Sequence, residues 1–232
     1  MKVEIYSDVA CPWCYIGKAR FERALGAFAG AAGVDVVFRP YQLDPATPRA
    51  AVPMFQYLEQ RFGPGAGGMV ARVADTARQE GLTMDFEHGL AANTFDAHRL
   101  MWLAEREHGA DVQRALGERL FRAHFAEGRD IGDAEALAEL AAAAGMDASR
   151  ARAFLGTDEG TDEVRRQVAE AQEMGITAVP TFVFDDRYAV QGAQPTSAFL
   201  QVLEQVAAEA QATGAEAAPD AAASCANGAC EA

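Results

Sequence analysis

The chain has 232 residues, of which 34 are acidic and 20 basic, giving a formal net charge of -14. This excess of acid argues against a nucleic-acid partner, because binding to nucleic acid relies on Lys and Arg side chains that neutralise phosphates. No run of apolar residues approaches the 18 or more that span a bilayer, so we expect no membrane partner. The first residues lack the pattern of a secretory leader, which predicts a cytoplasmic location.

The start of the chain predicts a βαβ unit. Residues 2–8 alternate apolar and polar side chains, as a half-buried strand does. A helix is predicted from Pro12 to about residue 29, and residues 34–43 predict a second strand, in which Pro40 indicates an edge position or a kink. Strand, helix and strand in this order form a βαβ unit with a right-handed crossover.

The middle of the chain, residues 46–174, predicts helices and no strand. Asn93, Asp133 and Asp147 are suitable N-terminal caps. The strand pattern returns as a short hairpin over residues 181–184 and 188–191, and a final helix is predicted over 195–212. The helices in the middle are predicted over residues 52–62, 67–80, 93–108, 111–126, 133–144, 147–155 and 161–174.

The four cysteines form two close pairs at opposite ends of the chain, Cys11 with Cys14 and Cys225 with Cys230. A small domain stapled by disulfides would distribute its cysteines along the chain. In a reducing compartment, close pairs are more often catalytic, redox-sensing or metal-binding.

The first pair stands between a strand and a helix, which gives it a chemical interpretation. Cys11 is expected at the start of the helix, where free backbone N–H groups and the helix dipole stabilise a thiolate. Pro12 suits the first helical turn, since its missing N–H would be unpaired there. Cys14 is expected to lie deeper and to attack a mixed disulfide between Cys11 and a substrate. Trp13 and Tyr15 are expected to form an apolar lip beside Cys11.

Half of a structural zinc site and two unreactive structural cysteines are the alternatives for Cys11 and Cys14. The CxxC spacing suits zinc, but the second pair has a CxxxxC spacing, and Cys11 is already placed for redox chemistry. We therefore favour a redox dithiol, with no metal and no cofactor.

The segment Tyr-Ser-Asp-Val-Ala-Cys-Pro-Trp-Cys over residues 6–14 resembles the DsbA-like group of thioredoxin-fold oxidoreductases, and within it the FrnE-type branch. Residues 93–100 (Asn-Thr-Phe-Asp-Ala-His-Arg-Leu) and 175–182 (Gly-Ile-Thr-Ala-Val-Pro-Thr-Phe) support the resemblance. It implies an α/β protein with a thioredoxin fold (βαβ-ββα) and a large all-helical insertion. The expected divisions are a thioredoxin-like domain over 1–45 and 175–212, an insertion domain over 46–174, and a tail over 213–232.

The resemblance also implies a role for Val179 and Pro180. In this fold the proline before the third strand is cis and lies against the CxxC motif. Val179 would then present its backbone groups to an extended substrate, as in the addition of a strand to a sheet edge.

The cysteines of the tail and one histidine are further candidates. Residues 213–224 have the composition of a flexible linker, so Cys225 and Cys230 could reach Cys11 and Cys14 and exchange disulfides with them. A tail whose thiols do little, and a metal site, are the alternatives. His98, in the family-like stretch, is a candidate for facing the cleft near Cys11, although a structural role is favoured.

These features predict a thiol–disulfide oxidoreductase of the isomerase or reductase type that works through its CPWC motif. Its expected partners are proteins or peptides with thiols or disulfides, with a low-molecular-weight thiol as a further candidate. The alternative is a glutathione-dependent isomerase or transferase of small molecules on the same fold, although relatives of 2-hydroxychromene-2-carboxylate isomerase typically carry serine where this chain has Cys11. A third hypothesis is a non-enzymatic holdase that uses an apolar cleft.

Overall fold

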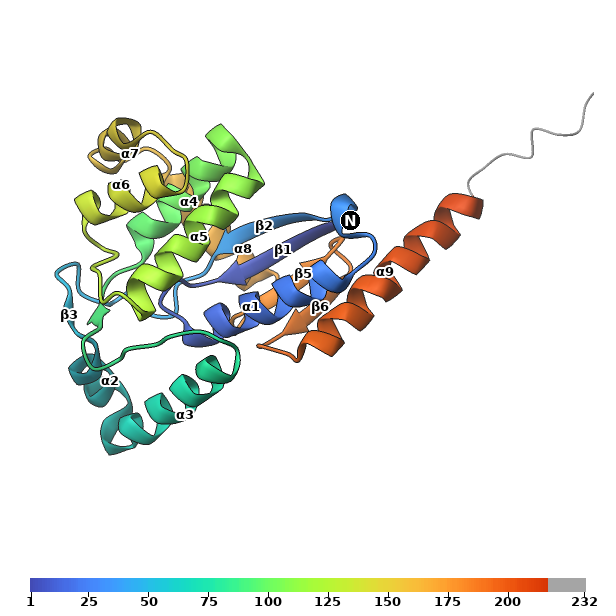
Figure 1. Cartoon of the computed structure of the whole chain (residues 1–232). Coiled ribbons are helices and arrows are strands. Elements are labelled where there is room, and N and C mark those ends of the chain that lie inside the picture. The colour runs from blue at the N-terminus through green and yellow to red at the C-terminus, as the bar shows by residue number, and fades with distance from the viewer. Residues whose placement is uncertain (217–232) are drawn as a thin grey trace, which may run out of the picture.

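The computed structural model describes residues 1–216. A four-stranded mixed sheet with the order β2-β1-β5-β6 lies at its centre (Figure 1). Strand β1 (Lys2–Ser7) runs parallel to β2 (Asp35–Pro40) and antiparallel to β5 (Thr181–Phe184), which pairs with β6 (Tyr188–Gln191). The two ends of the chain thus share one sheet. The hairpin strands have the predicted bounds, and β2 lies at an edge as its proline suggested.

One face of the sheet is covered by α1 (Pro12–Ala27) and α9 (Thr196–Glu216), which lie side by side (Figure 1). Aromatic rings fill the space between these helices and the sheet. The ring of Phe21 on α1 lies 5.3 Å from that of Phe182 on β5 and 5.7 Å from that of Phe199 on α9, measured between ring centroids. Burial of three large aromatic side chains fixes the first helix, and therefore its N-terminus, on the sheet.

The other face of the sheet is covered too, by α8 (Thr161–Glu173) (Figure 1). Tyr6 of β1 packs there with Ala171 of α8 in a second, smaller core. The prediction of a half-buried first strand is therefore wrong. Its polar Glu4 is buried as well and accepts a hydrogen bond of 2.7 Å from Arg39 on the neighbouring strand. Because its carboxylate is paired with Arg39, Glu4 can be buried at low cost. A strand that alternates apolar and polar residues can therefore be covered on both faces.

The chain between β2 and α8 is largely helical, as predicted. Two of the predicted capping residues act as caps: the side chain of Asp133 accepts the Ala136 N–H at 2.8 Å, and that of Asp147 accepts the Arg150 N–H at 2.7 Å. The helices of this region are α2 (Met54–Phe62), α3 (Ala66–Gln79), α4 (Phe95–His108), α5 (Ala110–Phe125), α6 (Ala134–Ala143) and α7 (Ala148–Leu155).

A short second sheet within this region corrects the prediction that it contains no strand. Strand β3 (Val52–Pro53) pairs antiparallel with β4 (Leu90–Ala91), and the Met54 N–H donates to the Gly89 carbonyl at 2.9 Å. Two residues are too few to show a period of two in the sequence. The pairing joins the two ends of the segment that contains α2 and α3.

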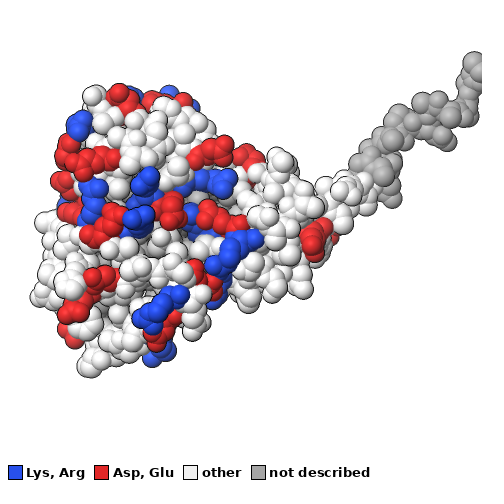
Figure 2. Space-filling view, viewed as in Figure 1, with Lys and Arg blue, Asp and Glu red and all other residues white. Residues whose placement is uncertain are grey.

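The surface of this region carries many ion pairs. In Figure 2, Lys and Arg side chains lie among Asp and Glu side chains over the visible face. Arg150, for example, lies 2.7 Å from Glu107 and 3.1 Å from Glu159. Exposed pairs of this kind contribute about 0–1 kcal/mol each, so they do not determine how the helices dock on the sheet.

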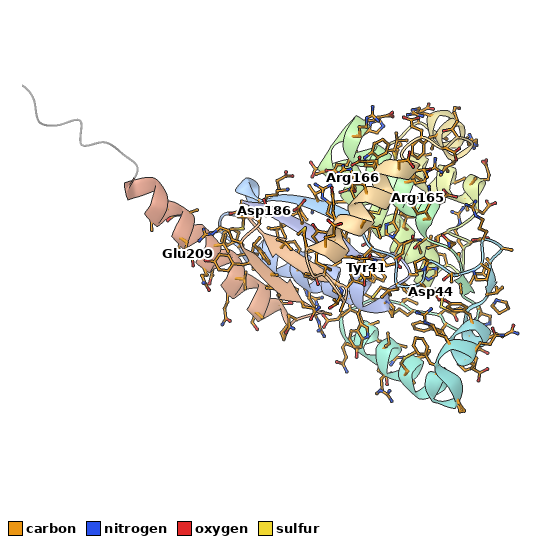
Figure 3. All side chains as sticks on the ribbon, turned by 180° about the vertical axis from the view of Figure 1, so that it is seen from behind. Tyr41, Asp44, Arg165, Arg166, Asp186 and Glu209 are labelled. Carbon is orange, nitrogen blue, oxygen red and sulfur yellow. The ribbon has the colours of Figure 1, made fainter. Side chains whose placement is uncertain are left out.

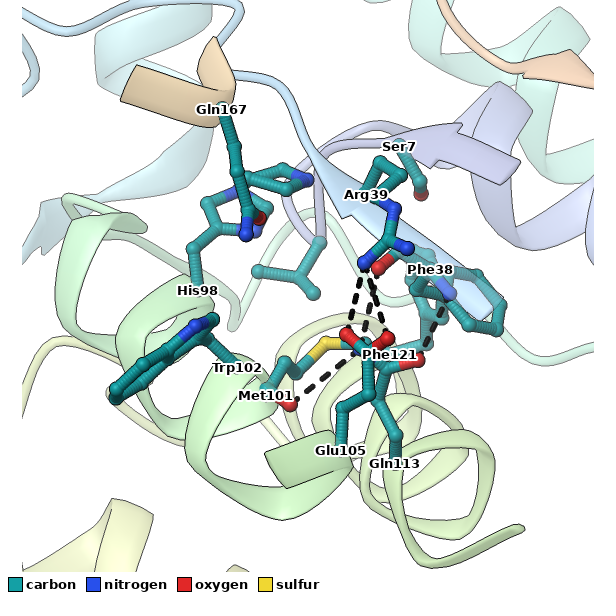
Figure 4. Close-up of a pocket in the computed structure, with 12 residues that line it drawn as sticks. Ser7, Phe38, Arg39, His98, Met101, Trp102, Glu105, Gln113, Phe121 and Gln167 are labelled. Carbon is teal, nitrogen blue, oxygen red and sulfur yellow. Dashed lines mark hydrogen bonds and ion pairs between the residues drawn. The ribbon is translucent and has the colours of Figure 1, made fainter. Parts of the chain in front are cut away.

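The helices dock on the edge strand β2 through a buried glutamine of α5. The Gln113 side-chain oxygen accepts the N–H of Phe38 at 2.8 Å, and the side-chain nitrogen donates to the carbonyl of the same residue at 3.1 Å (Figure 4). Gln113 is 1 % exposed. Its amide therefore satisfies backbone groups of an edge strand that water does not reach.

Replacing Gln113 by leucine is expected to lower the free energy of unfolding by roughly 2–6 kcal/mol. Leucine is similar in size to glutamine but cannot form hydrogen bonds. It therefore leaves two buried backbone groups of Phe38 unpaired, at a cost of about 1–3 kcal/mol each. Urea denaturation followed by circular dichroism measures the change. Gln201 is exposed on α9, so Gln201→Leu is the matched control and should shift stability by no more than about 0.5 kcal/mol. Equal stability of the two variants would contradict the bridging role.

Candidate active site

Cys11 is the N-cap residue of α1 and Pro12 is its first helical residue. The Cys11 backbone is extended, with φ -91° and ψ 113°, and its carbonyl accepts the N–H of Cys14 at 3.0 Å and of Tyr15 at 3.3 Å. The positive end of the dipole of a 16-residue helix therefore faces the region of the sulfur. Cys11 is only 3 % exposed, so a substrate reaches it through the cleft that it lines.

Cys14 lies beneath Cys11, and both are free thiols. Burial raises the pKa of the Cys14 thiol well above its ordinary value, and the neighbouring Cys11 sulfur adds to the rise. Ser7 and the Asp8 backbone act in the opposite direction and lower the pKa of Cys14. Cys14 therefore stays protonated as long as Cys11 carries no substrate. The two sulfurs thus differ in how readily they form a thiolate.

Val179 and Pro180 lie directly beside the cysteine pair. Their peptide bond is cis, as the resemblance implied. The Cys11 sulfur lies 3.8 Å from the Val179 carbonyl oxygen. Gly17 of α1 permits this approach, because a Cβ at that position would lie 2.8 Å from Pro180 Cγ. The structure therefore brings together residues that are 168 positions apart in the chain.

Of the two aromatic residues expected beside Cys11, only one lies at the rim of the cleft. Trp13 is 42 % exposed and lines the cleft, whereas Tyr15 is buried, with its ring stacked on Phe121 at 5.1 Å and its hydroxyl 3.1 Å from Glu118. The prediction of an apolar lip formed by both is wrong for Tyr15. Residues two apart on an α-helix point about 200° apart, so they cannot share one face.

A cleft of about 310 Å³ opens beside Cys11, between the N-terminus of α1 and the helices α2 and α3. Its wall is mostly apolar. The larger apolar side chains that line it are Pro12, Trp13, Leu43, Met54, Tyr57, Leu58, Phe62, Met69, Val70, Val73, Phe86, Phe125 and Val179. A cleft near Cys11 was expected from the sequence, but the residues of its wall were not, because most of them belong to helices whose relation to Cys11 depends on tertiary packing.

Asp8 is a buried carboxylate at the floor of the site, 2 % exposed. It accepts the Leu43 N–H at 2.8 Å and the Ala10 N–H at 3.3 Å, and its backbone carbonyl accepts the Cys11 N–H at 3.0 Å. Burial raises its pKa, but the His98 imidazole and the two amides outweigh burial, so the pKa of Asp8 lies below its ordinary value. Asp8 joins the loop before Cys11 to the loop after β2. The position of Asp8 in the motif before Cys11 does not by itself indicate this role.

His98 contacts Asp8 rather than the cleft. Its Nε2 lies 3.4 Å from a carboxylate oxygen of Asp8, at an orientation that makes no aligned hydrogen bond, and the residue is 4 % exposed. It lines a small cavity next to Arg39 and Met101 (Figure 4) and is absent from the wall of the cleft at Cys11. This agrees with the structural role favoured from the sequence.

His124 is the histidine that lines the cleft, and sequence analysis gave it no role. It is 1 % exposed, its ring meets that of Phe125 edge to face at 4.6 Å, and its Nδ1 makes no hydrogen bond. Burial lowers the pKa of His124 to about 4, against a smaller opposing effect of the Asp8 charge. The imidazole is therefore neutral at pH 7.

This burial predicts a pH dependence of stability. Between pH 6.5 and about 4 the unfolded chain protonates His124 and the folded chain does not, so stability is full above pH 6.5 and falls as the pH drops towards 4, by about 3 kcal/mol in total. Urea denaturation at half-unit pH steps measures the slope. We expect His124→Leu to flatten this part of the curve, whereas the control His108→Gln, at an exposed position, should retain it. A His124→Leu curve parallel to that of the wild type would contradict the argument.

Cys225 and Cys230 lie outside the described residues, so exchange with Cys11 and Cys14 stays a prediction. Within residues 1–216, no three His, Cys, Asp or Glu side chains are grouped in a way that could hold a metal ion. No helix in this part of the chain has the length and apolar character needed to cross a membrane.

Comparison with known proteins shows the family of this chain. Residues 2–204 match the family described as DSBA-like thioredoxin domain. A probable DsbA oxidoreductase from Streptomyces coelicolor is 41 % identical, covers 90 % of this chain and 91 % of its own, and superposes with a TM-score of 0.83. The uncharacterized protein YwbO of Bacillus subtilis is 28 % identical over 193 residues, which are 79 % of this chain and 86 % of that protein. The chain therefore belongs to the DsbA-like thioredoxin domain family of oxidoreductases.

A more distant neighbour has the same fold. The 2-hydroxychromene-2-carboxylate isomerase is 16 % identical, with a TM-score of 0.63 over 94 % of this chain and all of the other. The predicted thioredoxin fold with a helical insertion is confirmed by these comparisons. They do not assign the chain to the FrnE-type branch.

Proposed function

We propose that this protein is a thiol–disulfide oxidoreductase that reduces or isomerises disulfides of proteins or peptides through Cys11 and Cys14. The observation that carries the proposal is the placement of Cys11 as the N-cap of α1, 3.8 Å from the Val179 carbonyl, with buried Cys14 beneath it. A helix N-terminus stabilises the thiolate that thiol–disulfide exchange requires.

The reaction follows from the different environments of the two sulfurs. The Cys11 thiolate attacks one sulfur of a substrate disulfide, forms a mixed disulfide and releases the other substrate sulfur as a thiolate, which takes up a proton. The charge of Cys11 is thereby removed, and with it one of the causes that raise the pKa of Cys14. Cys14 then loses its proton and attacks Cys11. The second substrate thiol leaves, and two electrons have passed from the protein to the substrate.

The substrate chain is proposed to lie along Val179. The residue before the cis-proline offers its backbone carbonyl close to Cys11. An extended peptide can use backbone groups of this kind for main-chain hydrogen bonds, while its side chains enter neighbouring pockets. This arrangement would hold the substrate sulfur beside Cys11.

The proposal is tested by reduction of insulin and reactivation of scrambled ribonuclease with the full chain and a thiol reductant. We expect rates well above those of the reductant alone, without added metal or cofactor. Rates equal to those of the reductant in both assays would contradict the proposal.

The glutathione-dependent isomerase remains the second candidate because the cleft at Cys11 is large enough for a small molecule. Cys14 argues against it, since a thiol three residues from Cys11 would displace glutathione from a mixed disulfide. Conversion of 2-hydroxychromene-2-carboxylate in the presence of glutathione tests it, and activity that survives Cys14→Ser would favour it.

A further inference from the structure

We propose that the cleft beside Cys11 selects cysteines that are flanked by a large apolar side chain, and that it discriminates against glutathione and other thiols with free carboxylates. This inference rests on the proposed function and names its substrate class. Three independent features of the cleft carry it: its apolar rim, its volume and the state of its charges.

The rim of the cleft exposes large apolar side chains to solvent. Trp13, Leu43 and Phe62 are 42 %, 44 % and 52 % exposed, and all three line the cleft. They come from three separate parts of the chain, namely α1, the loop after β2, and the end of α2. Apolar surface of this kind beside a reactive sulfur favours an apolar partner, because covering it releases water.

The volume of the cleft fits side chains rather than a single small group. A dry apolar cavity of about 150 Å³ takes one benzene molecule. The cleft, at about 310 Å³, is about twice that size. A phenylalanine or leucine next to the reacting cysteine of a substrate therefore fits into the cleft beside Cys11, while the following substrate residue lies at the rim.

The charges of the cleft are already paired. Among residues 1–216, Arg61 is the single Lys or Arg that lines it. Its guanidinium contacts the Asp44 carboxylate and donates to the Tyr57 hydroxyl at 3.1 Å. Asp44 also accepts a hydrogen bond from Tyr57, and lies on the loop after β2 (Figure 3). Glutathione brings two carboxylates, and the lining offers them no uncommitted cation.

The remaining titratable groups of the lining strengthen this selection. Asp8 is ionised at pH 7 because its pKa lies below its ordinary value, and His124 is neutral. In the part of the chain that the structure describes, the Asp, Glu, Lys and Arg side chains of the wall are thus two carboxylates and one guanidinium, which gives a net negative site. An incoming carboxylate would meet repulsion as well as a loss of hydration.

Single-turnover kinetics with the pre-reduced full chain test the inference. The probes are glutathione disulfide and disulfide-linked dimers of the end-blocked peptides Gly-Phe-Cys-Gly, Gly-Gly-Cys-Gly and Gly-Glu-Cys-Gly, with formation of the Cys11–Cys14 disulfide followed by acid quench and mass spectrometry. We expect the phenylalanine peptide to react at least about tenfold faster than the glycine peptide, which is the discrimination that an apolar pocket provides. The glutamate peptide and glutathione disulfide should be slower than the glycine peptide.

Two variants locate the selectivity in the cleft. Phe62→Asp should reduce the advantage of the phenylalanine peptide severalfold, at an exposed position where folding is little affected. Asp44→Asn keeps the oxygen that accepts the Ala46 N–H but frees Arg61, so it should accelerate glutathione disulfide and the glutamate peptide severalfold. Asp75→Asn, which loses an exposed pair with Arg78 on α3, is the control and should change none of these rates.

The outcomes distinguish the two proposals. If no disulfide reacts faster than it does with a free thiol, the proposed function fails. If all of them react quickly and equally, or if glutathione disulfide is the fastest, the function stands and this inference is overturned. Unchanged selectivity in both Phe62→Asp and Asp44→Asn would also overturn it.

Discussion

Replacing Cys11 by serine is expected to reduce insulin reduction and ribonuclease reactivation to the rate of the reductant alone. A hydroxyl at the start of α1 is not ionised at neutral pH and cannot form a mixed disulfide, so the first step of the reaction is lost. Cys11 is buried and its side chain caps no backbone group of the helix. We therefore expect the serine variant to fold, which thermal unfolding checks.

Cys14→Ser is expected to stop the reaction one step later. Cys11 can still attack a substrate, but no second sulfur resolves the intermediate, so mixed disulfides with protein substrates should accumulate. Non-reducing electrophoresis and mass spectrometry of the purified variant measure them, and the double variant Cys11→Ser, Cys14→Ser is the control that should trap nothing. Absence of trapped protein in the single variant would count against protein substrates. Retained turnover in Cys11→Ser would contradict the assignment of the nucleophile.

The features of this site that sequence predicts are local ones. Cys11 at a helix start follows from a strand, a CxxC motif with Pro12 and a helical pattern within about 25 residues. The hairpin bounds follow from an alternating pattern interrupted by a turn. The cis bond before Pro180 came from the family resemblance, because a sequence alone shows only an X-Pro bond.

The features that sequence missed depend on contacts between distant residues. Both faces of β1 are buried because α8, more than 150 positions later, packs on the second face. The cleft depends on how α2 and α3 lie against α1. Asp8 has its partners in Leu43 and His98, and nothing near it in the chain indicates that its carboxylate would be buried.

Replacing Asp8 by alanine is expected to lower the free energy of unfolding by roughly 2–6 kcal/mol, because two backbone N–H groups lose their acceptor at about 1–3 kcal/mol each. The Leu43 and Ala10 N–H groups would lose their common acceptor, and His98 would lose its contact with the carboxylate. Urea denaturation at pH 7 measures the loss. Asp111→Ala is the control, because that side chain is 97 % exposed, and it should change stability by no more than about 0.5 kcal/mol.

Asp8→Asn removes the charge of this residue and keeps its shape. The pH dependence of stability then shows what the charge contributes. The folded pKa of Asp8 is lowered, so its contribution is present above the unfolded pKa of about 3.9 and is lost as the pH falls through the folded value. The stability difference between wild type and Asp8→Asn should therefore stay constant from pH 7 to 5 and shrink only below about pH 4, outside the range in which His124 acts. Because the Asp8 carbonyl holds the Cys11 N–H at 3.0 Å, a loop that has shifted in Asp8→Asn should also slow the attack of Cys11 on a disulfide. If the folded pKa of Asp8 were raised instead, the wild type would gain stability relative to Asp8→Asn as the pH falls from 7 to 5. Such a gain would show that the contacts with Leu43 and His98 do not hold Asp8 as a carboxylate.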